Sequence, residues 1–216
     1  MSVAARAVEI EWQFVVRDVD AFERWLAALR FAHWSLEAAS VVRLSDTYLD
    51  TADWRVWGEG FALRVRRNDA RTEASLKALG RARRGAARRR EIAARVRDAR
   101  PATLRALGGP VGAAVRRATA SGRLRRLFAV RTRRHTFTLR HDGRAVAEIA
   151  LDRTGITAGR GRSRRLERLE VEVKAGPPDL VARFVATLRR RRPLTLATRS
   201  KFAEGLRTAR LLPPPR

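Results

Sequence analysis

Residues 8–14 of the chain read VEIEWQF, and apolar and polar side chains alternate through them without a break. One face of this stretch carries Val8, Ile10, Trp12 and Phe14. The other face carries Glu9, Glu11 and Gln13. Successive side chains of a β-strand point to opposite faces, so this period of two predicts a strand over residues 7–16.

The same alternation recurs along the chain and predicts strands at 41–50, 60–67, 72–78, 88–96, 128–140, 143–152 and 164–174. Amphipathic or capped stretches predict helices at 20–30, within 101–120, at 178–191 and at 199–208. About eight strands are more than one flat sheet usually holds. We therefore expect an α+β fold, a closed eight-stranded antiparallel β-barrel with helices packed outside. Residues 1–210 would form one domain, and residues 211–216, LLPPPR, a disordered tail.

The charge of the chain predicts a polyanionic partner. The 216 residues include 48 Lys+Arg and 22 Asp+Glu, giving a net charge of +26, which attracts polyphosphate, nucleotides and nucleic acid alike. Only three of the basic residues are lysines: Lys77, Lys174 and Lys201. The absence of cysteine excludes disulfides and zinc–thiolate sites. No apolar run reaches membrane-spanning length and the N-terminus lacks a signal-peptide core, so we expect a cytoplasmic protein without a membrane partner.

The charged residues of the predicted strands occupy one face of each, as in Glu9/Glu11, Arg64/Arg66, Arg131/Arg133 and Glu170/Glu172. In an ordinary half-buried strand that face meets water, and this reading stays open for any single segment. In a closed barrel with helices outside, the apolar face must be the outer one, so the charged face would line the lumen. Carboxylates that converge there repel one another unless a cation lies between them, which makes them candidates for a metal site.

Several motifs occur together in one order and resemble the CYTH family, also called triphosphate tunnel metalloenzymes. They are EIEWQ at 9–13, DTYLDT at 46–51, LRVR at 63–66, LK at 76–77, RRE at 89–91, Asp152, EVEVK at 170–174 and SKF at 200–202. The match spans about residues 7–207, and all three lysines fall at motif positions. This family includes inorganic triphosphatases, thiamine triphosphatases and class IV adenylate cyclases.

The resemblance implies a tunnel that binds a linear triphosphate together with Mg²⁺ or Mn²⁺ and hydrolyses it, with inorganic tripolyphosphate as the favoured substrate. The residues implied to hold metal are Glu9, Glu11, Glu170, Glu172 and Asp152, with Glu148 as an alternative to Asp152. The residues implied to bind phosphate are Arg64, Arg66, Lys77, Arg131, Arg133, Lys201 and Lys174. Arg89 and Glu91 would form a pair that is structural or orients phosphate.

One position departs from the family pattern Glu-x-Glu-x-Lys, because this chain has Gln13 in place of the lysine. An amide donates a hydrogen bond but carries no charge, and the loss of a charge-assisted contact costs roughly 1.5–3 kcal/mol. An alternative hypothesis is therefore a non-catalytic module that binds polyphosphate or another polyanion. A nucleic-acid binder has the charge but no recognisable motif, so no specific nucleic-acid partner is expected. The protein would be a monomer or a homodimer.

The remaining conspicuous residues favour structural roles. His33, His135 and His141 have no ligand-like spacing and are predicted to be surface or strand residues. The five tryptophans are expected to pack between the helices and the barrel wall. The arginine-rich run at 81–90 is predicted to be a solvated loop.

Overall fold

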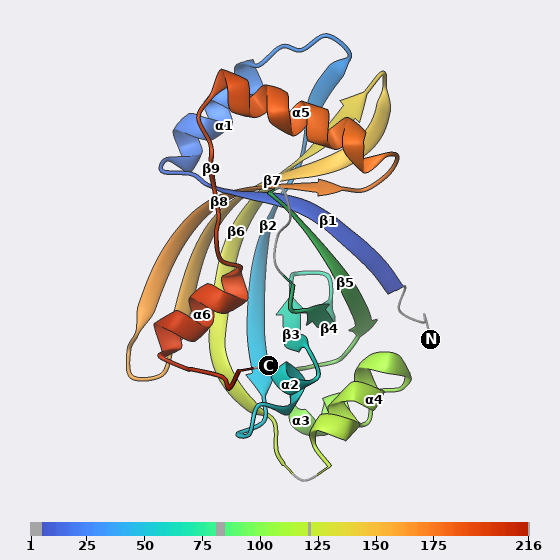
Figure 1. Cartoon of the computed structure of the whole chain (residues 1–216), viewed down its shortest axis with the longest axis vertical. Helices are drawn as coiled ribbons and strands as arrows, with labels where there is room; N and C mark the ends of the chain where they lie inside the picture. The colour runs from blue at the N-terminus through green and yellow to red at the C-terminus, as the bar shows by residue number, and fades with distance from the viewer. Residues whose placement is uncertain (1–5, 81–84, 121, 216) are drawn as a thin grey trace.

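The computed structural model describes residues 6–80, 85–120 and 122–215, and it confirms the closed eight-stranded antiparallel barrel (Figure 1). The strands are β1 (Arg6–Val15), β2 (Trp34–Asp50), β3 (Phe61–Arg67), β4 (Thr72–Ala78), β5 (Ala86–Arg95), β6 (Arg125–His141), β7 (Arg144–Ala158) and β8 (Ser163–Val173). They are hydrogen-bonded in the order β5-β4-β3-β2-β6-β7-β8-β1, and β1 pairs with β5 to close the ring. A short strand β9 (Thr195–Leu196) pairs with the last two residues of β1, Phe14 and Val15.

Six helices are formed by the residues in the described ranges. They are α1 (Val19–Ala28), α2 (Arg55–Gly58), α3 (Pro101–Arg105), α4 (Gly109–Ala118), α5 (Pro178–Arg191) and α6 (Lys201–Ala209). Figure 1 shows α1 and α5 at one end of the barrel, α2, α3 and α4 at the other end, and α6 in front of the strands between them. None of the helices in the described ranges is long and apolar enough to cross a membrane.

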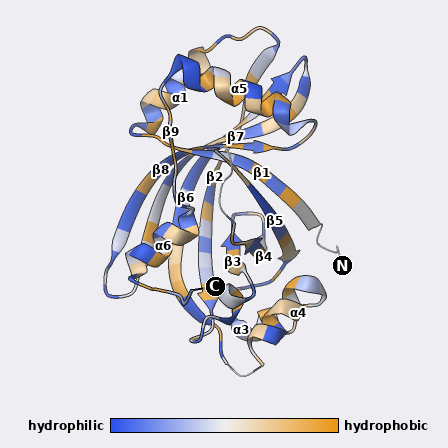
Figure 2. Ribbon diagram, viewed as in Figure 1, coloured by the Kyte–Doolittle hydropathy of each residue, from blue (hydrophilic) through white to orange (hydrophobic). Residues whose placement is uncertain are grey.

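The outer face of the barrel is apolar where helices cover it. Phe14, Leu151 and Leu169 are fully buried on the outer face under α1 and α5, together with Phe184 of α5. At the opposite end, Leu63 and Leu76 are buried beside α4. Bands of hydrophobic and hydrophilic residues accordingly alternate along the strands in Figure 2. This arrangement follows from the period of two, because a strand that buries its apolar side under a helix turns the opposite side inward.

A third apolar cluster lies inside the barrel, where α6 packs against the inner face. Phe202 and Leu206 of α6 contact Tyr48 and Phe128, whose rings stack with centroids 4.8 Å apart. Ser200 caps the helix, its hydroxyl accepting a hydrogen bond from the backbone N–H of Ala203 at 3.2 Å. The cap and the aromatic contacts place Lys201, the first residue of α6, at the inner wall of the barrel.

Some elements differ from those expected. Strand β2 begins at residue 34 instead of 41, and β7 runs to residue 158 instead of 152. Both extensions are stabilised by pairing with the long strand β6, which local side-chain patterns do not reveal. Of the predicted loop at 81–90, residues 81–84 lie outside the described residues. Residues 86–90 belong to β5, so the loop prediction is wrong for them, and the strand predicted at 88–96 begins two residues earlier than expected.

The chain beyond α6 has no helix or strand through residue 215. The carbonyl oxygen of Pro214 accepts a hydrogen bond from Nε1 of Trp57 at 3.0 Å, so this predicted tail contacts α2. The division of the chain into one domain and a tail stays a prediction.

Candidate functional site

The interior of the barrel contains a cavity of about 1060 Å³. Ten of the site residues predicted from the sequence line it: Glu9, Glu11, Arg64, Arg66, Lys77, Arg89, Glu170, Glu172, Lys174 and Lys201. They come from β1, β3, β4, β5, β8, the residue after β8, and the start of α6. Barrel closure thus brings into one space residues that are up to 192 positions apart in the sequence.

The acidic side of the cavity is built by three neighbouring strands. Glu11 of β1 lies directly opposite Glu172 of β8, and Glu148 of β7 lies opposite Glu172 on the other side. Burial, and then the nearby charges of Glu170 and Glu9, raise the pKa of Glu11. Burial also raises the pKa of Glu172, although Lys174 forms an ion pair with it at 2.8 Å. Both shifts arise first from removal of the carboxylates from water, and at Glu11 the neighbouring carboxylates add to this effect.

The basic side is built by β3, β4 and β5, and its cations are bound to carboxylates. Nζ of Lys77 donates to both oxygens of Glu9, at 3.0 and 2.8 Å, and lies 3.1 Å from Glu91. Arg64 donates to Glu91 at 3.0 Å, and Arg89 donates to Glu11 at 2.8 Å. Burial opposes ionisation of Glu91, but Lys77 and Arg64 outweigh it and lower its pKa. In place of the predicted pair of Arg89 with Glu91, each of the two residues is paired with a side chain of another strand that lies next to β5 or one strand further away.

Arg66 forms a bidentate pair with Asp46, which lies opposite it on β2. The two hydrogen bonds, from Nε and Nη2, are both 2.7 Å long. Asp46 is only 1% exposed, and burial would raise its pKa, but the hydrogen bonds and charge of Arg66 lower it to about 2. Asp46 therefore holds the guanidinium of Arg66 at the cavity wall.

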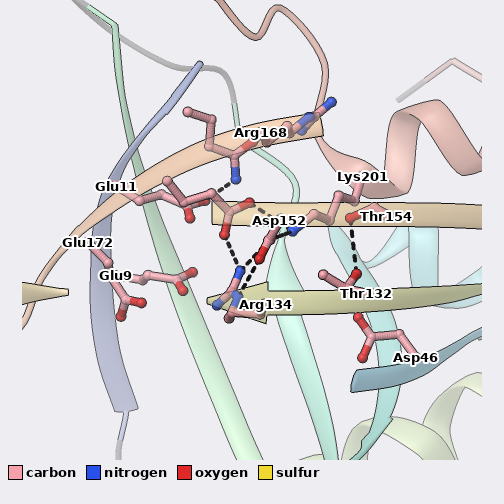
Figure 3. Close-up of polar contacts among 12 residues, drawn as sticks. Glu9, Glu11, Asp46, Thr132, Arg134, Asp152, Thr154, Arg168, Glu172 and Lys201 are labelled. Carbon is pink, nitrogen blue, oxygen red and sulfur yellow. Dashed lines mark hydrogen bonds and ion pairs between the residues drawn. The ribbon is translucent and has the colours of Figure 1, made fainter. Parts of the chain in front are cut away.

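A four-residue cluster lies where β6, β7, β8 and α6 meet. Asp152 receives hydrogen bonds from Arg134 at 2.8 and 2.7 Å and from Lys201, as Figure 3 shows. Lys201 also donates to Glu170 at 2.9 Å, and Arg134 donates to the other oxygen of Glu170. Burial opposes the charge on Glu170, but Lys201 and Arg134 lower its pKa well below the usual range. Asp152 is fully buried behind this layer, its oxygens are bound by the two cations, and it does not line the cavity.

The structure corrects the placement of Arg131 and Arg133. Both side chains are exposed and neither lines the cavity, whereas Arg134 does. The reason is the parity of β6: Phe137 is buried on the outer face under α5, so the odd-numbered residues before it also point outward. This apolar signal was present in the sequence and would have identified Arg134.

Gln13 lines the cavity, and a residue that sequence reasoning missed holds it in place. Nη1 of Arg168 donates to Oε1 of Gln13 at 3.0 Å, and Nε2 of Gln13 donates to Oε1 of Glu11 at 3.0 Å. Arg168 is 3% exposed and lies behind the cavity wall. Arg168 has the parity of Glu170 and Glu172, so alternation assigns it to the inner face, but no local pattern indicated that it would be buried behind the cavity wall.

The carboxylates suit a hard divalent cation in their chemistry, since Mg²⁺ and Mn²⁺ prefer oxygen ligands. Within the described ranges no three acidic or histidine side chains are grouped closely enough to form a complete set of ligands. Mg²⁺ is commonly bound by one or two carboxylates and keeps several waters, so the residues fit a cation whose remaining coordination positions are filled by water or by oxygens of a bound anion.

The charges around the cavity are close to balanced among the described residues. Seven glutamates and eight lysines or arginines line it. The cations can exchange carboxylate oxygens for other anionic oxygens without losing charge-assisted hydrogen bonds. The arrangement can therefore accept an anion together with a compensating cation.

A closed antiparallel barrel whose interior is lined by both acidic and basic side chains defines a tunnel-fold protein. The CYTH domain profile matches residues 7–206, nearly the whole chain, and the protein belongs to the CYTH family. The family predicted from the motifs is thus confirmed.

Solved structures share this fold at low sequence identity. A protein from Hippeastrum, provisionally assigned as an adenylyl cyclase and described as having a dominant triphosphatase activity, superposes with a TM-score of 0.64 at 18% identity. The match covers 95% of this chain and 98% of that one. A protein of Bacillus halodurans, provisionally assigned as an adenylate cyclase, has a TM-score of 0.61 at 19% identity, covering 92% and 97%. No curated protein matches the sequence significantly.

Proposed function

We propose that this protein hydrolyses a linear triphosphate inside its tunnel with the help of a divalent metal ion, and that inorganic tripolyphosphate is its preferred substrate. The observation that carries the proposal is the convergence of Lys77, Arg64, Arg66, Arg89 and Lys201 with four glutamates on one cavity. A triphosphate needs cations on several sides, and a hard metal needs carboxylate oxygens beside them.

The basic residues would bind the phosphate chain. Lys77 and Arg89 would exchange the oxygens of Glu9 and Glu11 for phosphate oxygens, since both kinds of acceptor are anionic. Arg66 stays oriented by Asp46 while its side chain remains 21% exposed toward the cavity. Cations held in this way stabilise the charge that accumulates on the bridging and terminal oxygens during in-line attack by water.

Glu9, Glu11, Glu170 and Glu172 would hold Mg²⁺ or Mn²⁺, which when bound supplies charge neutralisation and activation of water. The raised pKa of Glu11 supports this assignment, because burial and the nearby Glu170 and Glu9 disfavour its charged form and a bound cation would stabilise it. Asp152 would support the site by orienting Lys201 and Arg134 instead of by direct ligation. Lys174 is half-exposed at the edge of the cavity and would contact the end of the phosphate chain.

The proposal is tested by phosphate release from tripolyphosphate, thiamine triphosphate and ATP, each with Mg²⁺ and with Mn²⁺. We expect release from tripolyphosphate that depends on the metal. Replacing Glu11 by Gln removes a carboxylate charge at nearly constant shape, and we expect a loss of roughly 100-fold or more in kcat/KM.

Glu37→Gln provides the matched control, because Glu37 is an exposed glutamate on β2 that does not line the cavity. Its activity should equal that of the wild type. Equal activity of Glu11→Gln and the wild type would reject the metal assignment. Tight binding of long-chain polyphosphate without release of phosphate would instead support the alternative, a non-catalytic polyphosphate-binding module.

A further inference from the structure

Arg168 is a buried cation next to the site, and the proposed function gives it no role. It lies on β8, points into the wall of the barrel and is 3% exposed. Among the residues that the structure describes, no carboxylate oxygen lies within 4.0 Å of its guanidinium, so it has no direct ion pair. Two neutral oxygens accept its hydrogen bonds: Oε1 of Gln13 at 3.0 Å and the backbone carbonyl of Arg199 at 2.7 Å.

The bond from Arg168 fixes which way the amide of Gln13 points. Because a guanidinium can only donate, the amide must present its carbonyl oxygen to Arg168. Its NH₂ group then faces the cavity side and donates to Oε1 of Glu11 at 3.0 Å. A reversed amide would place two donors against each other at Arg168 and two acceptors at Glu11, and both contacts would be lost.

The same oxygen of Glu11 also accepts a hydrogen bond from Arg89 at 2.8 Å. Oε1 therefore has two donors, whereas Oε2 of Glu11 receives none within the described part of the chain. A carboxylate bound in this way keeps one oxygen oriented and the other available.

We propose that Arg168 is a positioning residue which, through Gln13, holds Glu11 with its second oxygen presented to the divalent cation. This inference rests on the proposed function for the role of Glu11. It also gives the uncharged Gln13 a role. The positive charge is on Arg168, behind Gln13 as seen from the cavity, and the amide of Gln13 links this guanidinium to the carboxylate of Glu11. A lysine at position 13 would instead place an ammonium beside this buried guanidinium.

The competing structural reading is that Arg168 only anchors the start of α6 through the carbonyl of Arg199. The two readings differ at Gln13, whose side chain is hydrogen-bonded to Arg168 and Glu11 and, within the described ranges, forms no hydrogen bond with that carbonyl. If Arg168 acts through Gln13, removing the amide should reproduce the effect of removing the arginine on the cation site. If Arg168 only anchors α6, removing the amide should leave the cation site unchanged.

The experiment measures binding of Mn²⁺ alone, without phosphate, to the wild type, Gln13→Met, Arg168→Met and the double variant. We expect each single variant to weaken Mn²⁺ binding about 10-fold or more, the usual effect of losing a group that orients a ligand. The double variant should be no weaker than Arg168→Met, because both substitutions break the same chain of hydrogen bonds. Arg168→Lys keeps the charge and one donor to Gln13, and it should recover part of the affinity.

Arg165→Met, an exposed arginine on the same strand, is the matched control and should bind Mn²⁺ as the wild type does. Unchanged Mn²⁺ affinity in Gln13→Met, or additive effects in the double variant, would overturn the proposal. Gln13→Met keeps the test decisive if Arg168→Met fails to fold. Mn²⁺ affinities that follow the expected pattern in a protein without turnover would reject the hydrolase function and leave this inference standing. If the wild type does not bind Mn²⁺, the inference about Arg168 is rejected.

Discussion

Asp46 illustrates how single residues of the site contribute to stability as well as to geometry. Its carboxylate is buried and bound by two hydrogen bonds to Arg66, and its pKa is lowered from 3.8 to about 2. A lowered pKa in the folded state means that the carboxylate stabilises the fold above its unfolded pKa. This contribution is lost as the pH falls through about 2.

Replacing Asp46 by Asn should therefore destabilise the protein by about 2 kcal/mol at pH 5. The difference in free energy of unfolding between wild type and variant should shrink as the pH falls from about 4 to about 2, because Asp46 becomes neutral in the wild type too. Urea unfolding at a series of pH values measures this difference. A difference that stays constant over that interval would show that the charge of Asp46 does not stabilise the fold.

At the scale of secondary-structure elements, α6 connects the core to the site. Its first residue, Lys201, binds Asp152 and Glu170, and its buried face packs on Phe128 inside the barrel. Gly205 makes this close approach possible, since a Cβ at that position would lie 2.1 Å from a ring carbon of Phe128. The helix can fit against the inner wall only because the side chain is missing there.

Gly205→Ala should lower the free energy of unfolding by about 1–3 kcal/mol, the usual cost of overpacking a core, and shift α6 away from the wall. Thermal unfolding measures the cost. Gly58→Ala in α2 is the control, because a Cβ at Gly58 meets no atom within 4 Å and alanine favours helix. If both alanine variants are equally stable, α6 does not pack as described.

Regular elements were well predicted from the sequence. The helix at 178–191 and the strand at 72–78 have the predicted bounds, because strong amphipathic patterns and turn residues are local signals. Residues 38–40 of β2 carry no such pattern, since all three are exposed; Ala38 and Ser40 pair with β6, and Ala39 lies at an irregularity between them. The sequence did not predict strand residues that lack alternation of their own and are held in the strand by pairing with a partner strand.

For the whole molecule, the dominant property is the net charge of +26. The interior of the tunnel is nearly balanced among its described residues, so most of the excess positive charge is elsewhere. Like charges repel one another, and this repulsion destabilises the compact state.

Raising the ionic strength from about 0.02 to about 0.2 M should therefore stabilise the protein, because it shortens the screening length. A gain of about 1 kcal/mol would raise Tm by about 2–4 °C for a chain of this size. Binding of tripolyphosphate should weaken over the same interval, since attraction to the anion is screened as well. Calorimetric scans and binding titrations check the two effects, and a Tm that falls with salt would contradict the first.

The sequence by itself predicted a barrel of strands with charged inner faces, and it identified most of the charged side chains that line the cavity. Alternation is a local property, so Glu9 and Glu11 could be assigned to one face from their own neighbours. Only the tertiary structure decided the partners: Lys77 with Glu9, and Arg168 with Gln13, which are 68 and 155 residues apart. Such contacts depend on the register between strands that meet when the barrel closes, and no local pattern encodes that register.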